Sequence, residues 1–206
     1  SYGLETYIQK GIVQDLETAE EYIRKRLSYN FLYTDLLAAR LAYDAAERGD
    51  LPALDELEDI LEASRIPMEL REASKKLGSR FIKTLAHMGA GRETAFFDSY
   101  LEARKGKTTC HPCAYGVFCA CAGIRREEAL AGFLYAQASA MVTNCVKTIP
   151  LSQSDGQKLL LSLHPRMEEL VREAETAGEE MLCASTPGFD LRGIQHETLY
   201  SRLYMS

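Results

Sequence analysis

The residues best suited to bind a metal lie in one short segment of the chain. Cys110, His111 and Cys113 flank Pro112, and two further cysteines follow at positions 119 and 121. Thiolate and imidazole groups are common ligands of zinc and nickel. Pro112 is typical of a helix start, the later cysteines point to different sides of that helix, and no second ligand pair follows at zinc-finger spacing. We therefore expect small buried core residues here, and keep a nickel or zinc carrier that uses Cys110, His111 and Cys113 as the alternative function.

No motif in the chain fixes an active site. The four histidines and thirty acidic residues form no recognisable catalytic pattern, and P-loop, GxGxxG, GxSxG and HExxH motifs are missing from the sequence. We expect His87 to end a helix and His164 to precede a proline, both in structural roles. The sequence therefore predicts no enzymatic activity and no cofactor; a helical enzyme assembled from scattered residues is the weakest alternative.

Polar residues are dense between Lys147 and Gln157, where one helix is expected to end and the next to begin. A capped helix start accounts for Ser154 and Asp155. It does not account for Lys147, Gln153 and Gln157. A role in contacting another protein and a simple connection are equally compatible with the composition of this segment.

The C-terminal segment differs in composition from the rest of the chain. After Cys183 comes a loop-like stretch, and the tail that follows offers Ile194, Leu199 and Leu203 as apolar anchors. Aromatic residues, arginine and methionine are enriched where proteins meet. We divide the chain into a helical domain at 1–182 and a partner-binding tail at 183–206, with packing onto its own domain as the alternative. The predicted contact residues of the tail are His196, Glu197, Tyr200, Arg202 and Tyr204.

Apolar residues recur at helical spacing through most of the sequence. With Asp15, Pro52, Pro67 and Gly89 as start and stop signals, we expect an all-α, single-domain bundle of about eight to ten helices with essentially no strand. The predicted helices cover about 15–27, 31–47, 52 onward, 67–89, 94–104, 112–122, 125–148 and 155 onward, the last bent at Pro165.

Composition limits the partners. The net charge of -6 and the lack of an evident basic stripe argue against nucleic acid and anionic membrane as partners. The longest uncharged run, 129–146, approaches the length of a membrane span but contains too many polar and small residues, so we expect a central helix. Six cysteines and no signal peptide favour free thiols and a cytoplasmic location.

Five short motifs, in order along the chain, resemble the UreF family of urease accessory proteins. The I-P-L-x-Q-x-D-G-Q element and the H-E…R-L ending are the most specific. In this sequence the motifs are Ser1-Tyr2-Gly3-Leu4-Glu5, Glu69-Leu70-Arg71, His111 with Ala114 and Gly116, Ile149 to Gln157, and His196-Glu197 with Arg202-Leu203.

The resemblance implies an all-helical homodimer that joins UreD (also called UreH) and the GTPase UreG and engages apo-urease. It implies a protein that modulates GTP hydrolysis by UreG, so that nickel reaches urease, and that is not itself an enzyme. Lys147 and the cluster of Gln153, Asp155, Gly156 and Gln157 fall on the conserved surface of that family. Arg202 falls on a tail arginine implicated in recruiting UreG, whereas the cysteines near His111 are not a family requirement.

Overall fold

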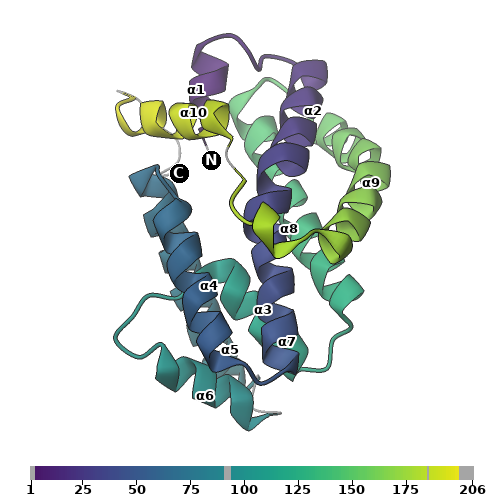
Figure 1. Ribbon diagram of the computed structural model, residues 1–206. Helices are drawn as coiled ribbons and strands as arrows, with labels where there is room; N and C mark the ends of the chain where they lie inside the picture. Colours follow the sequence, from purple (N-terminus) through teal and green to yellow (C-terminus); the bar gives the residue numbers. More distant parts are fainter. Residues whose placement is uncertain (1–2, 91–93, 185, 200–206) are drawn as a thin grey trace.

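The structure is a computed structural model that describes residues 3–90, 94–184 and 186–199, and these ranges contain helices and no strand. The prediction of an all-α bundle is confirmed (Figure 1). The helices are α1 (Leu4–Gln9), α2 (Leu16–Lys25), the π-helix η1 (Arg26–Leu36), α3 (Leu37–Glu47), α4 (Leu51–Ser64), α5 (Met68–Met88), α6 (Ala95–Ala103), α7 (His111–Cys121), α8 (Arg126–Thr148), α9 (Gln153–Thr176), the 3-10 helix η2 (Glu179–Met181) and α10 (Pro187–Glu197).

The first long helix is continuous from α2 through η1 to α3. It begins at Asp15, whose carboxylate accepts a hydrogen bond from the backbone N–H of Thr18 at 2.9 Å, as the sequence predicts. The predicted break between positions 27 and 31 was wrong. Leu27 and Phe31, which flank the expected break, are both buried. Their tertiary packing overrides the low helix propensity of the residues between them.

The predicted start and stop signals of α4 and α5 are confirmed. Asp50 caps α4 by accepting a hydrogen bond from the N–H of Ala53 at 3.1 Å, and Pro52 lies in the first turn. Pro67 precedes α5, which ends at Gly89 with a φ of 70°. The left-handed conformation of that glycine is one that other residues adopt only with strain.

Two apolar clusters form the core. One is shared mainly by α2, η1, α8 and α9, and the other by α3, α4, α5, α6 and α7, while Tyr43, Cys119 and Ala129 form a small third cluster in the described chain. Gly116 on α7 lets this helix approach α3 closely, because a Cβ atom there would lie 2.2 Å from the carbonyl oxygen of Ala39. Gly78 does the same for α5, where a Cβ atom would lie 2.1 Å from the carbonyl oxygen of Thr109. These contacts fix α7 between α3 and α5.

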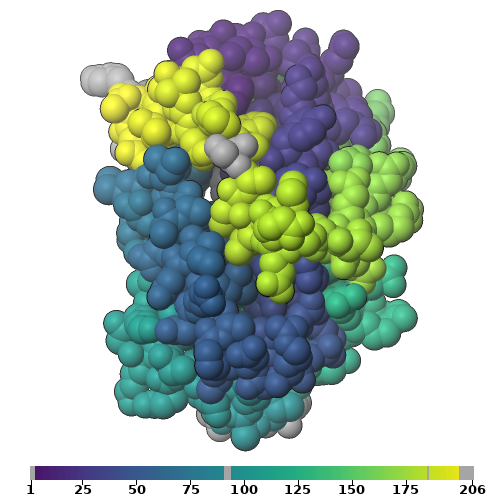
Figure 2. All heavy atoms as spheres, in the orientation of Figure 1, coloured from purple at the N-terminus to yellow at the C-terminus, as the bar shows by residue number. Residues whose placement is uncertain are grey.

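By length and composition alone, helix α8 could cross a membrane. In the fold, 44% of its most apolar stretch of 18 residues is buried inside the protein. Its buried side packs against α9, which continues through Pro165 to Thr176. After α9 the chain crosses the surface beside η1 and α3 and returns as α10 beside α1, at the end where the chain begins (Figures 1 and 2).

Candidate functional site

The polar junction between α8 and α9 is held by a reciprocal capping box. The hydroxyl of Ser152 accepts a hydrogen bond from the N–H of Asp155 at 3.0 Å, and the Asp155 carboxylate accepts one from the N–H of Ser152 at 3.2 Å. Hydrogen bonds from Ser152 lower the pKa of the Asp155 carboxyl. The assignment of a capping role to Ser154 was wrong; Ser154 is exposed and the cap is Ser152.

Gly156 is also explained by local packing. It is buried on the first turn of α9, where a Cβ atom would lie 2.7 Å from Cγ2 of Val146 on α8. Any larger residue would push the two helices apart. Asp155 and Gly156 therefore shape the junction itself.

Three side chains of the junction have no such explanation. Lys147 lies in the last turn of α8, and Gln153 and Gln157 lie in the first turns of α9. All three are exposed, and none makes a hydrogen bond or ion pair with another residue that the structure describes. We call these three residues the junction surface.

His196 on α10 lies in a buried cluster instead of on the surface. Its side chain is 1% exposed, with Nδ1 2.8 Å from Oε2 of Glu69 and Nε2 2.8 Å from Oε2 of Glu5. Glu197 completes the arrangement by accepting a hydrogen bond from the N–H of Glu69 at 3.2 Å. We call these four residues the histidine cluster. It joins α1, α5 and α10, which are far apart in the sequence.

The histidine cluster gives three of the sequence motifs a common location. Glu5 comes from the S-Y-G-L-E motif, Glu69 from the E-L-R motif and His196 from the H-E motif. Sequence spacing alone does not indicate that they meet, because nearly two hundred residues separate the first from the last. His196 has almost no exposed surface here, and its ring contacts carboxylates of α1 and α5.

Close packing supports the same docking of α10. Gly193 faces α5, where a Cβ atom would lie 2.9 Å from Cγ of Pro67. The hydroxyl of Thr6 donates a hydrogen bond to the carbonyl of Arg192 at 3.2 Å, and Phe189 packs against the ring of Tyr7. The expectation that Ile194 anchors this segment was wrong. Ile194 is 42% exposed, because α10 turns its glycine and histidine face toward α1 and α5.

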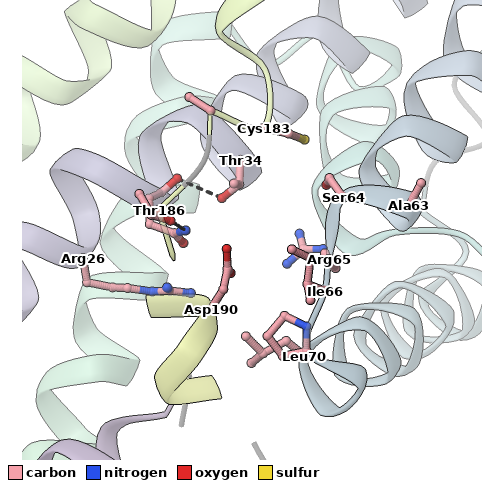
Figure 3. Close-up of a pocket in the computed structure, with 13 residues that line it drawn as sticks. Arg26, Thr34, Ala63, Ser64, Arg65, Ile66, Leu70, Cys183, Thr186 and Asp190 are labelled. Carbon is pink, nitrogen blue, oxygen red and sulfur yellow. Dashed lines mark hydrogen bonds between the residues drawn. The ribbon is translucent and has the colours of Figure 1, made fainter. Parts of the chain in front are cut away.

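The π-helix η1 provides a second docking platform that the sequence analysis missed. Arg26, Asn30 and Thr34, each four residues apart, line a cavity of about 290 Å³ between η1, the α4–α5 connection and the C-terminal segment (Figure 3). Asn30 donates a hydrogen bond to Thr186, and the Arg26 guanidinium lies 5.0 Å from the ring centre of Phe189. Helices of the π type are frequent at functional sites.

Charge in this cavity comes from both of its sides. Arg65 pairs with Asp35 at 2.8 Å on the bundle side. Asp190 from α10 enters from the other side, and burial raises the pKa of its carboxyl. On the opposite rim the N–H of Cys183, whose φ is 60°, donates to the carbonyl of Tyr33 at 2.7 Å. Polar contacts of the C-terminal segment thus border the cavity.

The cysteine segment lies in the core. Cys110 and Cys113 are at most 2% exposed, and burial raises the pKa of both thiols, that of Cys110 to about 12. The carboxylate of Glu58 accepts a hydrogen bond from the N–H of Cys110 at 2.7 Å. Burial lowers the pKa of His111, whose ring packs edge-on against Phe81. Within the described ranges no three His, Cys, Asp or Glu side chains are grouped as metal ligands.

The remaining predicted contact residues, Tyr200, Arg202 and Tyr204, lie outside the residues that the structure describes. The histidine cluster and the junction surface lie near each other. Leu4 of α1 and Asn144 of α8 line one small cavity, and Asn144 precedes Lys147 by three residues. Helix α1, which carries Glu5 of the histidine cluster, therefore packs near the end of α8, and both regions lie at the same end of the molecule (Figure 1).

The fold and these surfaces define a helical protein whose candidate functional features are docking surfaces at one end of a bundle. The family model for UreF matches residues 13–164 of the chain. Over its full length the chain is 37% identical to the urease accessory protein UreF of Haemophilus influenzae (strain PittGG), of which it covers 87%. It is 35% identical to the UreF proteins of Actinobacillus pleuropneumoniae serotype 5b (strain L20) and Bacillus sp. (strain TB-90), covering 90% of each. The chain belongs to the UreF family of urease accessory proteins.

Proposed function

We propose that this protein is a non-enzymatic scaffold of urease maturation that needs no cofactor. As a homodimer it binds UreD (UreH) and the GTPase UreG, and the complex engages apo-urease. It modulates GTP hydrolysis by UreG so that nickel is delivered to the urease active site. The setting is the cytoplasm, and neither nucleic acid nor membrane is a partner.

The observation that supports this proposal best is the anchoring of α10. The histidine cluster holds α10 against α1 and α5, so the described C-terminal segment ends in a helix that is docked on the bundle. We propose that Tyr200, Arg202 and Tyr204 contact UreG from there. A tail that starts from a rigid base loses less conformational freedom on binding than one that hangs from a flexible linker.

The junction surface supplies the second proposed contact. Lys147, Gln153 and Gln157 are exposed and uncommitted within the described chain, while their neighbours Asp155 and Gly156 hold the backbone in place. Such a rigid base with polar side chains projecting from it is suited to specific recognition, since the backbone that carries them is already ordered before binding. We therefore propose the junction surface as a part of the complex interface.

Reconstitution tests the proposal. Purified UreD, UreG, GTP and magnesium are mixed with the protein, and the mass of the complex is measured by light scattering after size exclusion. We expect Arg202→Ala and Lys147→Ala to weaken assembly, each by about tenfold if it removes a charged interface contact. Arg172→Ala, which removes an exposed arginine on the far part of α9, is the matched control. Full assembly by both variants would refute the proposed surfaces, and no assembly by the unmodified protein would refute the scaffold.

The carrier alternative is tested separately. It requires Cys110, His111 and Cys113 to bind nickel or zinc, although both thiols are buried and hold their protons strongly. Equilibrium dialysis measures the bound metal. Binding that disappears in the Cys110→Ser, Cys113→Ser double variant would favour the carrier over the scaffold.

A further inference from the structure

Helix α5 carries a row of positive side chains that the sequence analysis did not identify as a stripe. Lys76, Arg80, Lys83 and His87 follow one another at intervals of four, three and four residues, which places them on one face of a helix. The row is about 16 Å long at 1.5 Å per residue. All four residues are exposed, and together they line an open groove of about 790 Å³.

The row differs from the cations around it. Lys75, on the adjacent face of α5, pairs with Glu62 at 2.6 Å, and Lys107 pairs with Asp55 at 2.7 Å. Lys76, Arg80 and Lys83 form no ion pair with any residue that the structure describes. The one carboxylate that lines the groove, Glu72, faces Lys75 at 3.4 Å. The groove therefore presents positive charge that the described chain leaves uncompensated.

Helix stability does not account for the row. Like charges at i, i+4 destabilise a helix, and Lys76 with Arg80 forms such a pair. Cations are favourable near the C-terminal end of a helix, but only within its last turn. His87 fits that explanation, whereas Lys76 and Arg80 lie twelve and eight residues before Met88, where α5 ends. The repulsion between Lys76 and Arg80 is unfavourable, and a negatively charged partner would relieve it.

Apolar side chains beside the row indicate the class of partner. Leu77, which is 49% exposed, and Met88, which is 70% exposed, lie on α5 about a quarter turn from the row and do not line the groove itself. Exposed arginine and methionine together are typical of protein interfaces. A nucleic acid would use the cations but not these apolar groups, and the net charge of -6 opposes its approach.

From this combination we propose that the α5 groove docks an acidic amphipathic segment of a partner protein, whose carboxylates pair with Lys76, Arg80 and Lys83 and whose apolar residues cover Leu77 and Met88. The surface is separate from the junction surface and the histidine cluster. Its test therefore uses neither UreD nor UreG and does not depend on the function proposed above.

The probe is a fluorescein-labelled peptide that repeats Glu-Glu-Leu-Ala, and fluorescence anisotropy at several salt concentrations measures its affinity for the full chain. We expect binding that weakens as salt rises. The Lys76→Gln, Arg80→Gln, Lys83→Gln triple variant should bind about tenfold more weakly, because three screened ion pairs are lost. The matched control is Lys10→Gln, Arg48→Gln, Arg172→Gln, which removes three exposed positive charges from other faces and should bind like the unmodified protein.

Circular dichroism checks that both triple variants remain helical, and Leu77→Ser provides a single substitution that tests the apolar part without changing charge. It should weaken peptide binding at high salt, where ion pairs contribute least. Equal losses in the two triple variants would overturn the proposal, as would undetectable binding of the peptide at low salt. Tighter binding of a short DNA duplex than of the peptide would also overturn it, in favour of a phosphate-binding groove.

Discussion

The junction surface and the histidine cluster look alike in sequence but differ in the folded chain. Both consist of polar residues that belong to short motifs resembling those of the family. At the junction, Lys147, Gln153 and Gln157 are exposed, and their side chains make no hydrogen bond or ion pair with other described residues. In the histidine cluster, His196 is buried between Glu5 and Glu69 at 2.8 Å from each. The comparison separates polar motif residues that the fold uses from polar motif residues that the fold leaves exposed.

The two regions should respond differently to substitution. Removing one member of a buried, hydrogen-bonded group exposes the others to an environment that solvates them poorly. Removing an exposed side chain without contacts changes the free energy of unfolding very little. Stability measurements therefore test the comparison directly, and complex formation tests only the junction.

The largest effect is expected for His196→Ala. The imidazole bridges two carboxylates and holds α10 against α1 and α5, so its loss should reduce the free energy of unfolding by about 3 kcal/mol. Urea denaturation measures this value, and hydrogen exchange should locate the loss of protection in α10 before the rest of the chain.

His164→Ala is the matched control for that substitution. His164 is exposed on α9 and its ring centre lies 6.2 Å from that of Tyr135. Its replacement should change the free energy of unfolding by less than about 0.5 kcal/mol. If both histidine variants were equally stable, the histidine cluster would not be what fixes α10.

The next largest loss of stability is expected for Gly193→Ala. In Gly193→Ala the new methyl group would lie 2.9 Å from Cγ of Pro67, and overpacking of this kind costs about 1–3 kcal/mol. Gly188→Ala on the same helix meets no atom within 4 Å, and alanine in a helix is favoured over glycine by about 0.5–1 kcal/mol. Thermal unfolding of the two variants should therefore shift in opposite directions, and a shift in the same direction would contradict close packing of α10 on α5.

Most of the fold was predictable because its signals are local. Capping by Asp15, helix starts near Pro52 and Pro67, and the stop at Gly89 each depend on residues within one or two turns. The continuous helix from α2 to α3 was not predictable in this way, because burial of Leu27 and Phe31 in the assembled core outweighs local propensity.

The candidate site was predictable only in part. The density of polar residues at the junction was visible in the sequence. The division between Asp155, which belongs to the capping box of α9, and Lys147, which has no such role, needed the fold. The meeting of Glu5, Glu69 and His196 depends on three helices packing together. No local sequence pattern predicts such a contact. The cavity beside η1 was not predictable either, because it also forms between segments that are far apart in the sequence.

Within the junction, Ser152→Ala should have a moderate effect on stability. It removes the N-cap of α9, and losses of this kind are about 1 kcal/mol. Lys147, five residues away, makes no hydrogen bond or ion pair with a residue that the structure describes, so Lys147→Ala should change the free energy of unfolding by less than about 0.5 kcal/mol. Urea denaturation of both variants checks the assignment. A larger loss for Lys147→Ala than for Ser152→Ala would place Lys147 among the residues that serve the fold.

The smallest effect concerns the carboxyl group of Asp155. Hydrogen bonds from Ser152 lower its pKa in the folded chain, so the folded state binds a proton less readily than the unfolded state does. The contribution of Asp155 to stability is complete above its pKa in the unfolded chain, about 3.9. It is lost as the pH falls through the lower pKa of the folded chain.

In Ser152→Ala the pKa of Asp155 should return toward its ordinary value, because the hydroxyl that donates to the carboxylate at 2.7 Å is gone. A carbon-detected NMR titration of the carboxyl group measures the change. Asp15, whose carboxylate accepts hydrogen bonds from Thr18 on α2, is an internal reference that should not move. An unchanged pKa of Asp155 would mean that the capping box does not bind this carboxylate in solution. Asp155 would then rejoin Lys147, Gln153 and Gln157 as a side chain available to a partner.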